Sequence, residues 1–206
     1  MKELILLKSG EVVLKGLNRH NFEDVMIKNM KRRIEDLGVF RIWKKQSTLY
    51  VEPQSEDIDM DLLVSRLQTV FGIAALTRAC IVEKNFEDIC AKSREYLAET
   101  LEEARTFKVE AKRADKLFPM TSPEICRELG GQLLEEFPHL RVDVEHPDVT
   151  VTVEIRETAA YVHTDQLPGA GGMPVGTSGK AAMLLSGGMD SRVGGYMMGK
   201  AGLEVV

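Results

Sequence analysis

The feature that most constrains the fold of this chain is a six-residue sequence, Ser-Gly-Gly-Met-Asp-Ser, at positions 186–191. It follows an apolar run at 181–185 that predicts a buried parallel strand, and it precedes a stretch at 192–200 that predicts a helix. Glycines let a backbone turn tightly and approach a ligand, and the first N–H groups of the next helix point, unpaired, into the turn. The sequence therefore predicts an anion-binding turn between a strand and a helix.

The side chains of this turn suit nucleotide phosphates. Ser186 and Ser191 can donate hydroxyl hydrogen bonds, and Asp190 is a hard oxygen ligand for a magnesium ion that bridges phosphates. The other common phosphate loop, G-x-x-x-x-G-K-[ST], does not fit, because Ala181 follows Lys180 and Pro174 stands where the first glycine should be. An ordinary strand-to-helix turn made of small residues is the alternative interpretation.

The pattern S-G-G-x-D-S resembles the PP-loop of ATP pyrophosphatases, which cleave ATP to AMP and pyrophosphate and so activate a carbonyl oxygen. The resemblance implies ATP and Mg²⁺ as cofactors and Asp190 as the required acid of the motif. It further implies that phosphate is cradled by Ser186, Gly187, Gly188 and Ser191, and that the backbone of Leu184 and Leu185 lies near the nucleotide.

Composition predicts a globular protein. With 206 residues and 44% hydrophobic content, the chain can form one large or two small domains. No apolar segment reaches the roughly 18 residues that span a bilayer, and the N-terminus lacks a signal-peptide pattern, so we expect a cytoplasmic protein without membrane contact. Cys80, Cys90 and Cys126 lack C-x-x-C spacing, which favours neither a disulfide framework nor a zinc site.

Charge is unevenly distributed along the chain. The net charge is −5, but residues 8–45 hold ten Lys or Arg against five Asp or Glu, and residues 105–116 hold five against two. Residues 46–104 hold five basic against twelve acidic residues. This segregation indicates a basic face that could bind RNA; the alternative is that the charges only solvate the surface.

The hydrophobic pattern predicts a mixed fold of the α+β and α/β classes. Residues 1–75 read as a ferredoxin-like β-α-β-β-α-β domain, in which Asn21 is the expected N-cap of the first helix and Gly38 its stop. The expected strands are at 4–7, 39–43, 48–51 and 73–82, and the second helix is at 60–70. Residues 76–166 predict a second α/β domain with helices at 86–104 and 122–137 and strands at 106–112, 142–144, 149–155 and 160–163.

The last part of the chain changes character. Residues 167–179 contain five glycines and two prolines, which predicts either a passive linker or a flexible segment that passes under the nucleotide or RNA. Residues 180–206 supply one strand, the turn, one helix and the opening of a second strand, too little to bury both faces of a parallel sheet. We therefore expect a truncated Rossmann-like PP-loop domain that is mobile or packed in a non-native way.

Three blocks together resemble the tRNA 4-thiouridine synthetase family, which also serves thiamine thiazole synthesis. Residues 9–19 read S-G-E-V-V-L-K-G-L-N-R, residues 107–118 read F-K-V-E-A-K-R-A-D-K-L-F and are similar to a THUMP RNA-binding domain, and residues 171–180 read G-G-M-P-V-G-T-S-G-K before the PP-loop. The resemblance covers the whole chain. One departure is Arg192, where family members commonly carry Pro.

Membership would imply that the first two domains hold tRNA while the PP-loop domain adenylates the C4 oxygen of a uridine, after which persulfide sulfur displaces AMP. Expected partners are tRNA, a cysteine desulfurase as sulfur donor and a sulfur-carrier protein. A homodimer is a further possible assembly. The expected phosphate contacts are Lys112, Arg113 and Lys116, with Lys15 and Arg19 as weaker candidates. The resemblance places the persulfide cysteines beyond residue 206, so the chain alone is expected to bind tRNA without catalysis.

Two other functions remain open. The first is another PP-loop ATPase such as a tRNA lysidine, NAD or GMP synthetase, although those do not place a THUMP-like unit ahead of the loop. The second is a non-catalytic THUMP accessory protein that only binds tRNA.

Overall fold

The computed structural model describes residues 1–206 and forms two compact units. One unit holds Met1–Leu4 with Thr77–Asp165, and the other holds Ile5–Leu76 with Gln166–Val206. The strands β1 (Glu3–Ser9) and β4 (Ile73–Val82) contribute residues to both units. None of the helices combines the length and the apolar character that are needed to span a bilayer.

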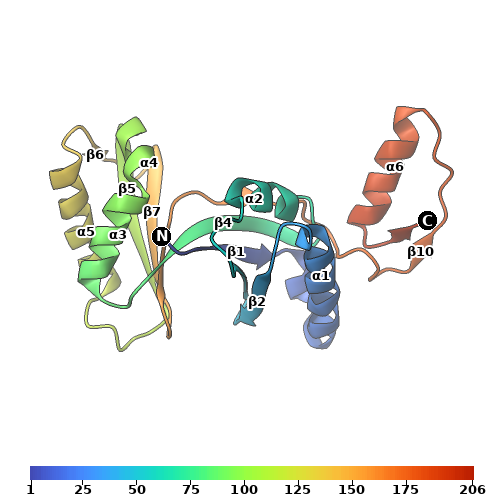
Figure 1. The fold of residues 1–206 in the computed structure, drawn as a ribbon, viewed down its shortest axis with the longest axis horizontal. Coiled ribbons are helices and arrows are strands. Elements are labelled where there is room, and N and C mark those ends of the chain that lie inside the picture. Colours follow the sequence, from blue (N-terminus) through green and yellow to red (C-terminus); the bar gives the residue numbers. More distant parts are fainter. The chain divides into compact units, whose positions relative to one another are not determined.

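The unit that starts at Ile5 has the predicted ferredoxin-like order. Its elements after β1 are η1 (Glu11–Asn18), α1 (Arg19–Ile34), β2 (Phe40–Lys45), β3 (Thr48–Pro53) and α2 (Met60–Gln68), followed by β4. The strands are ordered β2-β3-β1-β4, and β3 pairs antiparallel with both β1 and β2. Met26 and Met30 of α1 and Leu63 and Leu67 of α2 pack on apolar strand residues in one core, so both helices cover the same face of the sheet. Figure 1 shows both helices beside the strands β1 and β4.

The start of α1 corrects a prediction. The helix begins at Arg19 with Asn18 in the N-cap position, rather than after Asn21, because the short 3-10 helix η1 runs directly into it. Gly38 does follow the helix, with a φ of 141° that favours glycine.

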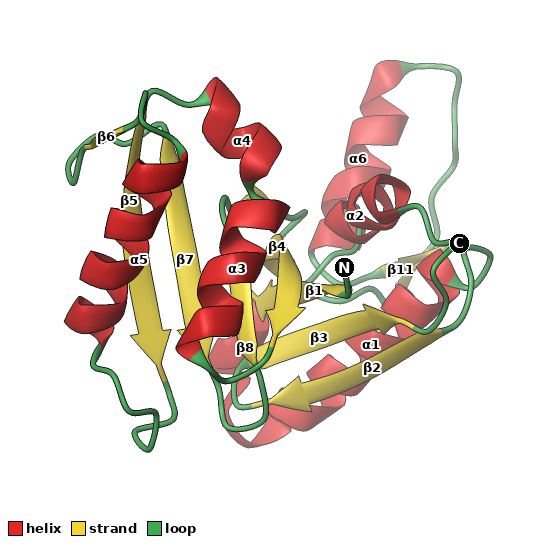
Figure 2. Cartoon of the chain, turned by 60° about the vertical axis from the view of Figure 1, so that its left-hand side comes forward, coloured by secondary structure: helices red, strands yellow, loops and turns green.

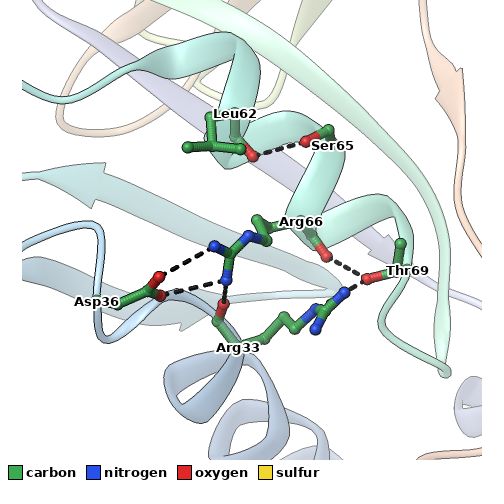
Figure 3. A network of polar contacts seen from close by, with 6 residues as sticks. All are labelled: Arg33, Asp36, Leu62, Ser65, Arg66 and Thr69. Carbon is green, nitrogen blue, oxygen red and sulfur yellow. Dashed lines mark hydrogen bonds and ion pairs between the residues drawn. The ribbon is translucent and has the colours of Figure 1, made fainter.

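Polar contacts join α1 to α2, as Figure 3 shows. Arg66 of α2 binds the Asp36 carboxylate with two N–H groups, at 3.2 and 3.0 Å. Arg33 donates from Nε to Thr69 Oγ1 at 3.1 Å. These contacts are exposed, so the shared core contributes most of the packing energy between the helices and the pairs add specificity of position.

The other unit packs three helices on one face of a sheet. Its elements after β4 are α3 (Phe86–Tyr96), α4 (Ala98–Glu103), β5 (Thr106–Arg113), α5 (Ser122–Glu136), β6 (Arg141–Val142), β7 (Val149–Ile155) and β8 (Ala160–His163), in the strand order β4-β8-β7-β5-β6. β5 and β7 are parallel, with Phe107 opposite Val149, whereas β8 is antiparallel to β7. Phe107 and Val151 pack on Ile89, Leu101 and Leu129 of the helices, all fully buried. Figure 2 shows α3 and α5 in front of the strands β5 and β7.

Three predictions for this unit need correction. The expected helix at 86–104 is two helices, because Leu97 leaves the helical region with φ −102° and ψ 7°. The expected strand at 142–144 ends at Val142, because the Asp143 carboxylate accepts the N–H groups of Glu145 and His146 and turns the chain. α5 begins at Ser122, where the sequence Ser122-Pro123-Glu124 predicted an N-cap followed by a first-turn proline, but the cap is Thr121, since the Glu124 carboxylate accepts both the backbone N–H and the hydroxyl of Thr121.

The glycine-rich segment is fixed rather than free. β9 (Leu167–Pro168) pairs antiparallel with the start of β4, and Gly72 N–H donates to Gly171 O at 2.8 Å. Met173 is buried, and its N–H donates to Lys200 O at 2.9 Å. Gly172 has a φ of 70°, and a Cβ there would lie 2.3 Å from that same carbonyl oxygen, so only glycine fits. Backbone hydrogen bonds thus join this segment to β4 and to the end of α6.

The last elements are β10 (Lys180–Ala181), α6 (Met189–Lys200) and β11 (Glu204–Val205). β10 and β11 pair in parallel, which confirms the predicted opening of a second strand. The prediction of a buried strand through Leu185 is wrong: the pairing ends with Met183 N–H on Val206 O, and no segment of this chain pairs with the next two leucines. The helix also begins earlier than residue 192, at Met189.

Candidate nucleotide site and RNA-binding surface

The predicted anion-binding turn lies at the N-terminus of α6. Gly188 is the N-cap, with φ −78° and ψ 162°, and it has no side chain that could bond to the first N–H groups of the helix. Ser186 Oγ lies 3.1 Å from Ser191 Oγ and accepts the Gly188 N–H at 3.3 Å. Hydrogen bonds that involve the two serines therefore stabilise the turn. The N–H groups of the first turn of α6 have no partner in the turn and face outward, where they favour an anion.

Of the two roles predicted for the glycines, a tight turn and close approach to a ligand, the structure does not require the first. Neither Gly187 nor Gly188 has a positive φ, so the backbone does not need glycine to make this turn. A Cβ on Gly187 would meet no atom within 4 Å, and a Cβ on Gly188 would meet only Ser186 Oγ at 3.4 Å. The absence of side chains instead keeps the space above the N–H groups open, and this fits the close approach of a phosphate group.

The neighbours of the turn are accessible to a ligand. Leu184 is 96% exposed and Leu185 is 73% exposed, so their backbone is not covered by this chain. Asp190 is exposed in the first turn of α6. No three His, Cys, Asp or Glu side chains gather into a metal site anywhere in the structure. A magnesium ion here would therefore need phosphate oxygens to complete its coordination.

Lys15 of η1 and Arg19, the first residue of α1, differ in exposure. Lys15 is exposed, with its ammonium 5.4 Å from the centre of the Phe22 ring. Arg19 instead donates from Nε to Glu23 at 2.6 Å, and its Nη2 is buried without a hydrogen-bond partner. Burial would raise the pKa of Glu23, but hydrogen bonds from Lys44 and Arg19 lower it. Arg19 is thus engaged in an ion cluster around the buried Glu23 carboxylate.

Glu23 and Lys44 were not singled out by sequence reasoning. The i, i+4 spacing of Arg19 and Glu23 is a signal that could have indicated their ion pair. Lys44, which also binds Glu23, lies on β2 and has no such local signal.

The three cations at the end of β5 also differ. Lys112 is 54% exposed, with Nζ 3.7 Å from a Glu154 oxygen, and Lys116 is exposed in the following loop. Arg113 donates from Nη1 to the carbonyls of Phe118 at 3.1 Å and Met120 at 2.9 Å, so it holds that loop closed. The structure therefore leaves Lys112 and Lys116 available for a phosphate and uses Arg113 within the protein.

Glu154, which sequence reasoning missed, is the charged centre of this sheet. It is 6% exposed on β7, and its carboxylate accepts from Arg156 at 2.6 Å and lies 3.5 Å from His163 Nε2. Burial would raise the pKa of Glu154, but hydrogen bonds and charges from His163 and Arg156 lower it to about 2. The carboxylate is therefore ionised at neutral pH and balances the cations around it.

The cysteines do not form a reactive site. Burial raises the pKa of the Cys80 and Cys90 thiols to about 11 and raises that of Cys126 as well. A buried thiol of this kind carries little thiolate at neutral pH, which disfavours a role as nucleophile.

Three family models match successive parts of the chain. The model described as the ThiI ferredoxin-like domain matches residues 4–77, the THUMP domain matches 83–165, and the thiamine biosynthesis protein (ThiI) model matches 176–206. Among curated proteins, the chain is similar to the probable tRNA sulfurtransferases of Acetivibrio thermocellus, with 45% identity, and Alkaliphilus oremlandii, with 41% identity. Both matches cover the whole chain and 53% and 52% of the relative, so the chain spans about half the length of these relatives.

Solved structures agree with these matches. A crystal structure of a 4-thiouridine synthetase in complex with RNA and bound ATP has a TM-score of 0.88 and 34% identity, and the match covers all of this chain and 52% of that one. The structure of PH1313 from Pyrococcus horikoshii has a TM-score of 0.84 and 27% identity, covering all of this chain and 67% of that one.

Proposed function

Since the chain belongs to the tRNA sulfurtransferase family, we propose that the protein binds tRNA and uses ATP to convert a uridine to 4-thiouridine. AMP is transferred from ATP to the C4 oxygen of the uridine with release of pyrophosphate. The outer sulfur of a protein persulfide then attacks C4 and expels AMP, which leaves the base joined to the protein through an S–S bond. A second thiol breaks that bond, so that the sulfur stays on C4 and the two thiols end as a disulfide. The observation that carries the proposal is the open N-terminus of α6, whose free N–H groups and small residues suit a nucleotide phosphate.

In this proposal the turn binds the phosphates of ATP. The backbone N–H groups after Gly188 and the hydroxyls of Ser186 and Ser191 donate to phosphate oxygens, while Gly187 leaves room for them. The exposed backbone of Leu184 and Leu185 is available to the rest of the nucleotide. Asp190 is the acid that would hold a Mg²⁺ ion against the phosphates, where the ion would neutralise developing charge.

The RNA-binding residues follow from exposure and charge. Lys112 and Lys116 are proposed to contact tRNA phosphates directly, with Lys15 as a further contact. Arg19 and Arg113 would act through their internal hydrogen bonds, by holding the start of α1 and the loop after β5. We also propose that the chain is divided into a ferredoxin-like domain at 1–75, a THUMP domain at 76–166, a glycine-rich linker at 167–179 and the start of the PP-loop domain at 180–206.

Membership of the family also suggests which proteins exchange sulfur with this protein. We propose a cysteine desulfurase as the sulfur donor, a sulfur-carrier protein of thiazole synthesis as a second acceptor, and a homodimer as the assembly, all in the cytoplasm. None of the three cysteines of this chain is proposed to carry the persulfide, because burial raises the pKa of each.

A second candidate is a non-catalytic tRNA-binding protein, favoured by the observation that the PP-loop leucines are exposed rather than packed. Another PP-loop ATPase that modifies tRNA is the remaining alternative. These candidates agree on tRNA binding and differ in the chemistry that they predict at Asp190.

The test is Asp190→Ala in the product of the whole reading frame that encodes these residues, with Arg192→Ala as an exposed control on the same helix. We expect Asp190→Ala to abolish 4-thiouridine formation while the dissociation constant for tRNA stays within about twofold, because the carboxylate serves chemistry rather than RNA contact. Thiolation that survives Asp190→Ala, or a wild-type protein that binds tRNA and never thiolates it, would contradict the proposal.

A further inference from the structure

Phe71 is a large apolar side chain that lies outside the hydrophobic core of the ferredoxin-like elements. It lies between α2 and β4, is half-buried, and does not belong to the core cluster formed by α1, α2 and the strands. Its ring instead packs edge-on against Tyr196 of α6, with ring centres 5.1 Å apart and an interplanar angle of 65°. Such a pair has a preferred geometry as well as buried area.

The same ring also fits closely against the backbone of α6. Gly199 is buried, and a Cβ on it would lie 3.0 Å from Phe71 Cε2, so glycine lets the helix approach the ring. Along the same helix, a Cβ on Gly194 would meet no atom within 4 Å. The contact therefore involves the last turns of α6 and leaves its first turn, with the phosphate-binding residues, free.

The glycine-rich segment fastens α6 at the same end. Asn29 of α1 donates to Val175 O at 3.0 Å, and Met173 N–H donates to Lys200 O at 2.9 Å. The last turn of α6 is thus contacted by Phe71 and is hydrogen-bonded to the glycine-rich segment, which α1 contacts in turn. A helix of twelve residues is roughly 18 Å long and stiff over that length, so a change at its last turn moves its first turn.

We propose that Phe71 is a positioning residue, which sets the place of the phosphate-binding turn relative to the ferredoxin-like domain. Through Tyr196 and Gly199 it orients α6, and through α6 it orients the bound ATP toward the uridine of the tRNA. This inference rests on the proposed function, since it concerns the ATP site of that reaction.

The kinetic test uses Phe71→Ala and Phe71→Tyr in the product of the whole reading frame. A reacting group displaced by about 1 Å can slow a reaction by about 100-fold. We expect Phe71→Ala to lower kcat for 4-thiouridine formation by about 10- to 100-fold, while KM for ATP and Kd for tRNA stay within about twofold. Phe71→Tyr keeps the ring and restores kcat.

Two kinetic outcomes would overturn the inference. An unchanged kcat in Phe71→Ala would mean that the contact does not orient the turn. A parallel weakening of kcat, ATP affinity, tRNA affinity and Tm would mean that Phe71 only stabilises the fold. A wild-type protein that makes no 4-thiouridine would instead refute the proposed function.

A second measurement does not depend on activity. In the 206-residue chain, Gly199→Val and Gly194→Val change helix propensity equally, but only the first meets the Phe71 ring. We expect hydrogen exchange of the α6 amides to be at least about tenfold faster in Gly199→Val than in Gly194→Val. Equal exchange in the two variants would show that Phe71 does not hold the helix.

Discussion

Replacing Glu154 by Gln tests the electrostatic account of the THUMP sheet. The substitution keeps the shape of the side chain and removes the charge that faces Arg156 at 2.6 Å. The pKa of Glu154 is lowered from 4.5 to about 2 in the folded chain. At about 1.4 kcal/mol per unit, this difference stabilises the folded state by about 3 kcal/mol when the carboxyl is ionised.

The sign of the pH dependence follows from the lowered pKa. The stabilisation is fully present above the unfolded pKa of 4.5 and is lost as the pH falls toward the folded pKa of about 2. We therefore expect Glu154→Gln to lower the free energy of unfolding by about 2 to 3 kcal/mol at pH 7 and by about half as much at pH 3.

Urea unfolding followed by circular dichroism measures both values, and hydrogen exchange of the β7 amides assigns the loss to this unit. Glu110→Gln on the neighbouring strand is the control. Its pair with Lys108 is partly exposed and is far less buried than Glu154, so we expect a loss of about 0 to 1 kcal/mol. A Glu154→Gln loss below about 0.5 kcal/mol, or one equally large at both pH values, would refute the reasoning.

Further predictions concern binding and packing. Alanine at both Lys112 and Lys116 should weaken tRNA binding and flatten its salt dependence by about 0.7 to 0.9 log units per lost contact; an unchanged slope would make them ordinary surface residues. Gly172→Ala should lower the free energy of unfolding by at least about 2 kcal/mol, because its Cβ would lie 2.3 Å from a carbonyl oxygen. Gly171→Ala, at a φ of 64° with open space around the added Cβ, should lower the free energy of unfolding by only about 1 kcal/mol. Equal losses of stability for the two variants in thermal unfolding would contradict the clash at residue 172. Asp36→Ala, which breaks the exposed pair in Figure 3, should change stability by less than about 1 kcal/mol, and a larger loss in urea unfolding would contradict its surface character.

Local patterns predicted most of the secondary structure. The apolar alternation of β7 and the run of β4 gave their bounds directly, because each strand lies on a core that selects its inward residues. The miss at Asn21 has a local cause, since η1 continues into α1 and shifts the cap to Asn18. The miss at Leu185 has a long-range cause, because an apolar run becomes a strand only where another strand pairs with it.

The candidate site was predicted in part. The position of Ser186 to Ser191 before a helix followed from residue types alone, and the structure places that turn at the start of α6. The separation of Lys116, which is exposed, from Arg113, which binds two carbonyls, could not be predicted, because it depends on the path of the loop between them. The contact of Phe71 with Gly199 joins residues far apart in the sequence, and no pattern within either segment indicates it.

The products of ATP test the central claim most directly. The reading-frame product is incubated with tRNA, ATP, Mg²⁺ and a persulfide donor, and the nucleotide products are counted against the 4-thiouridine formed. Adenylation at the α6 turn predicts AMP and pyrophosphate in equal amounts, with one of each for every 4-thiouridine. ADP and phosphate as the products, or 4-thiouridine formed without ATP, would contradict the account.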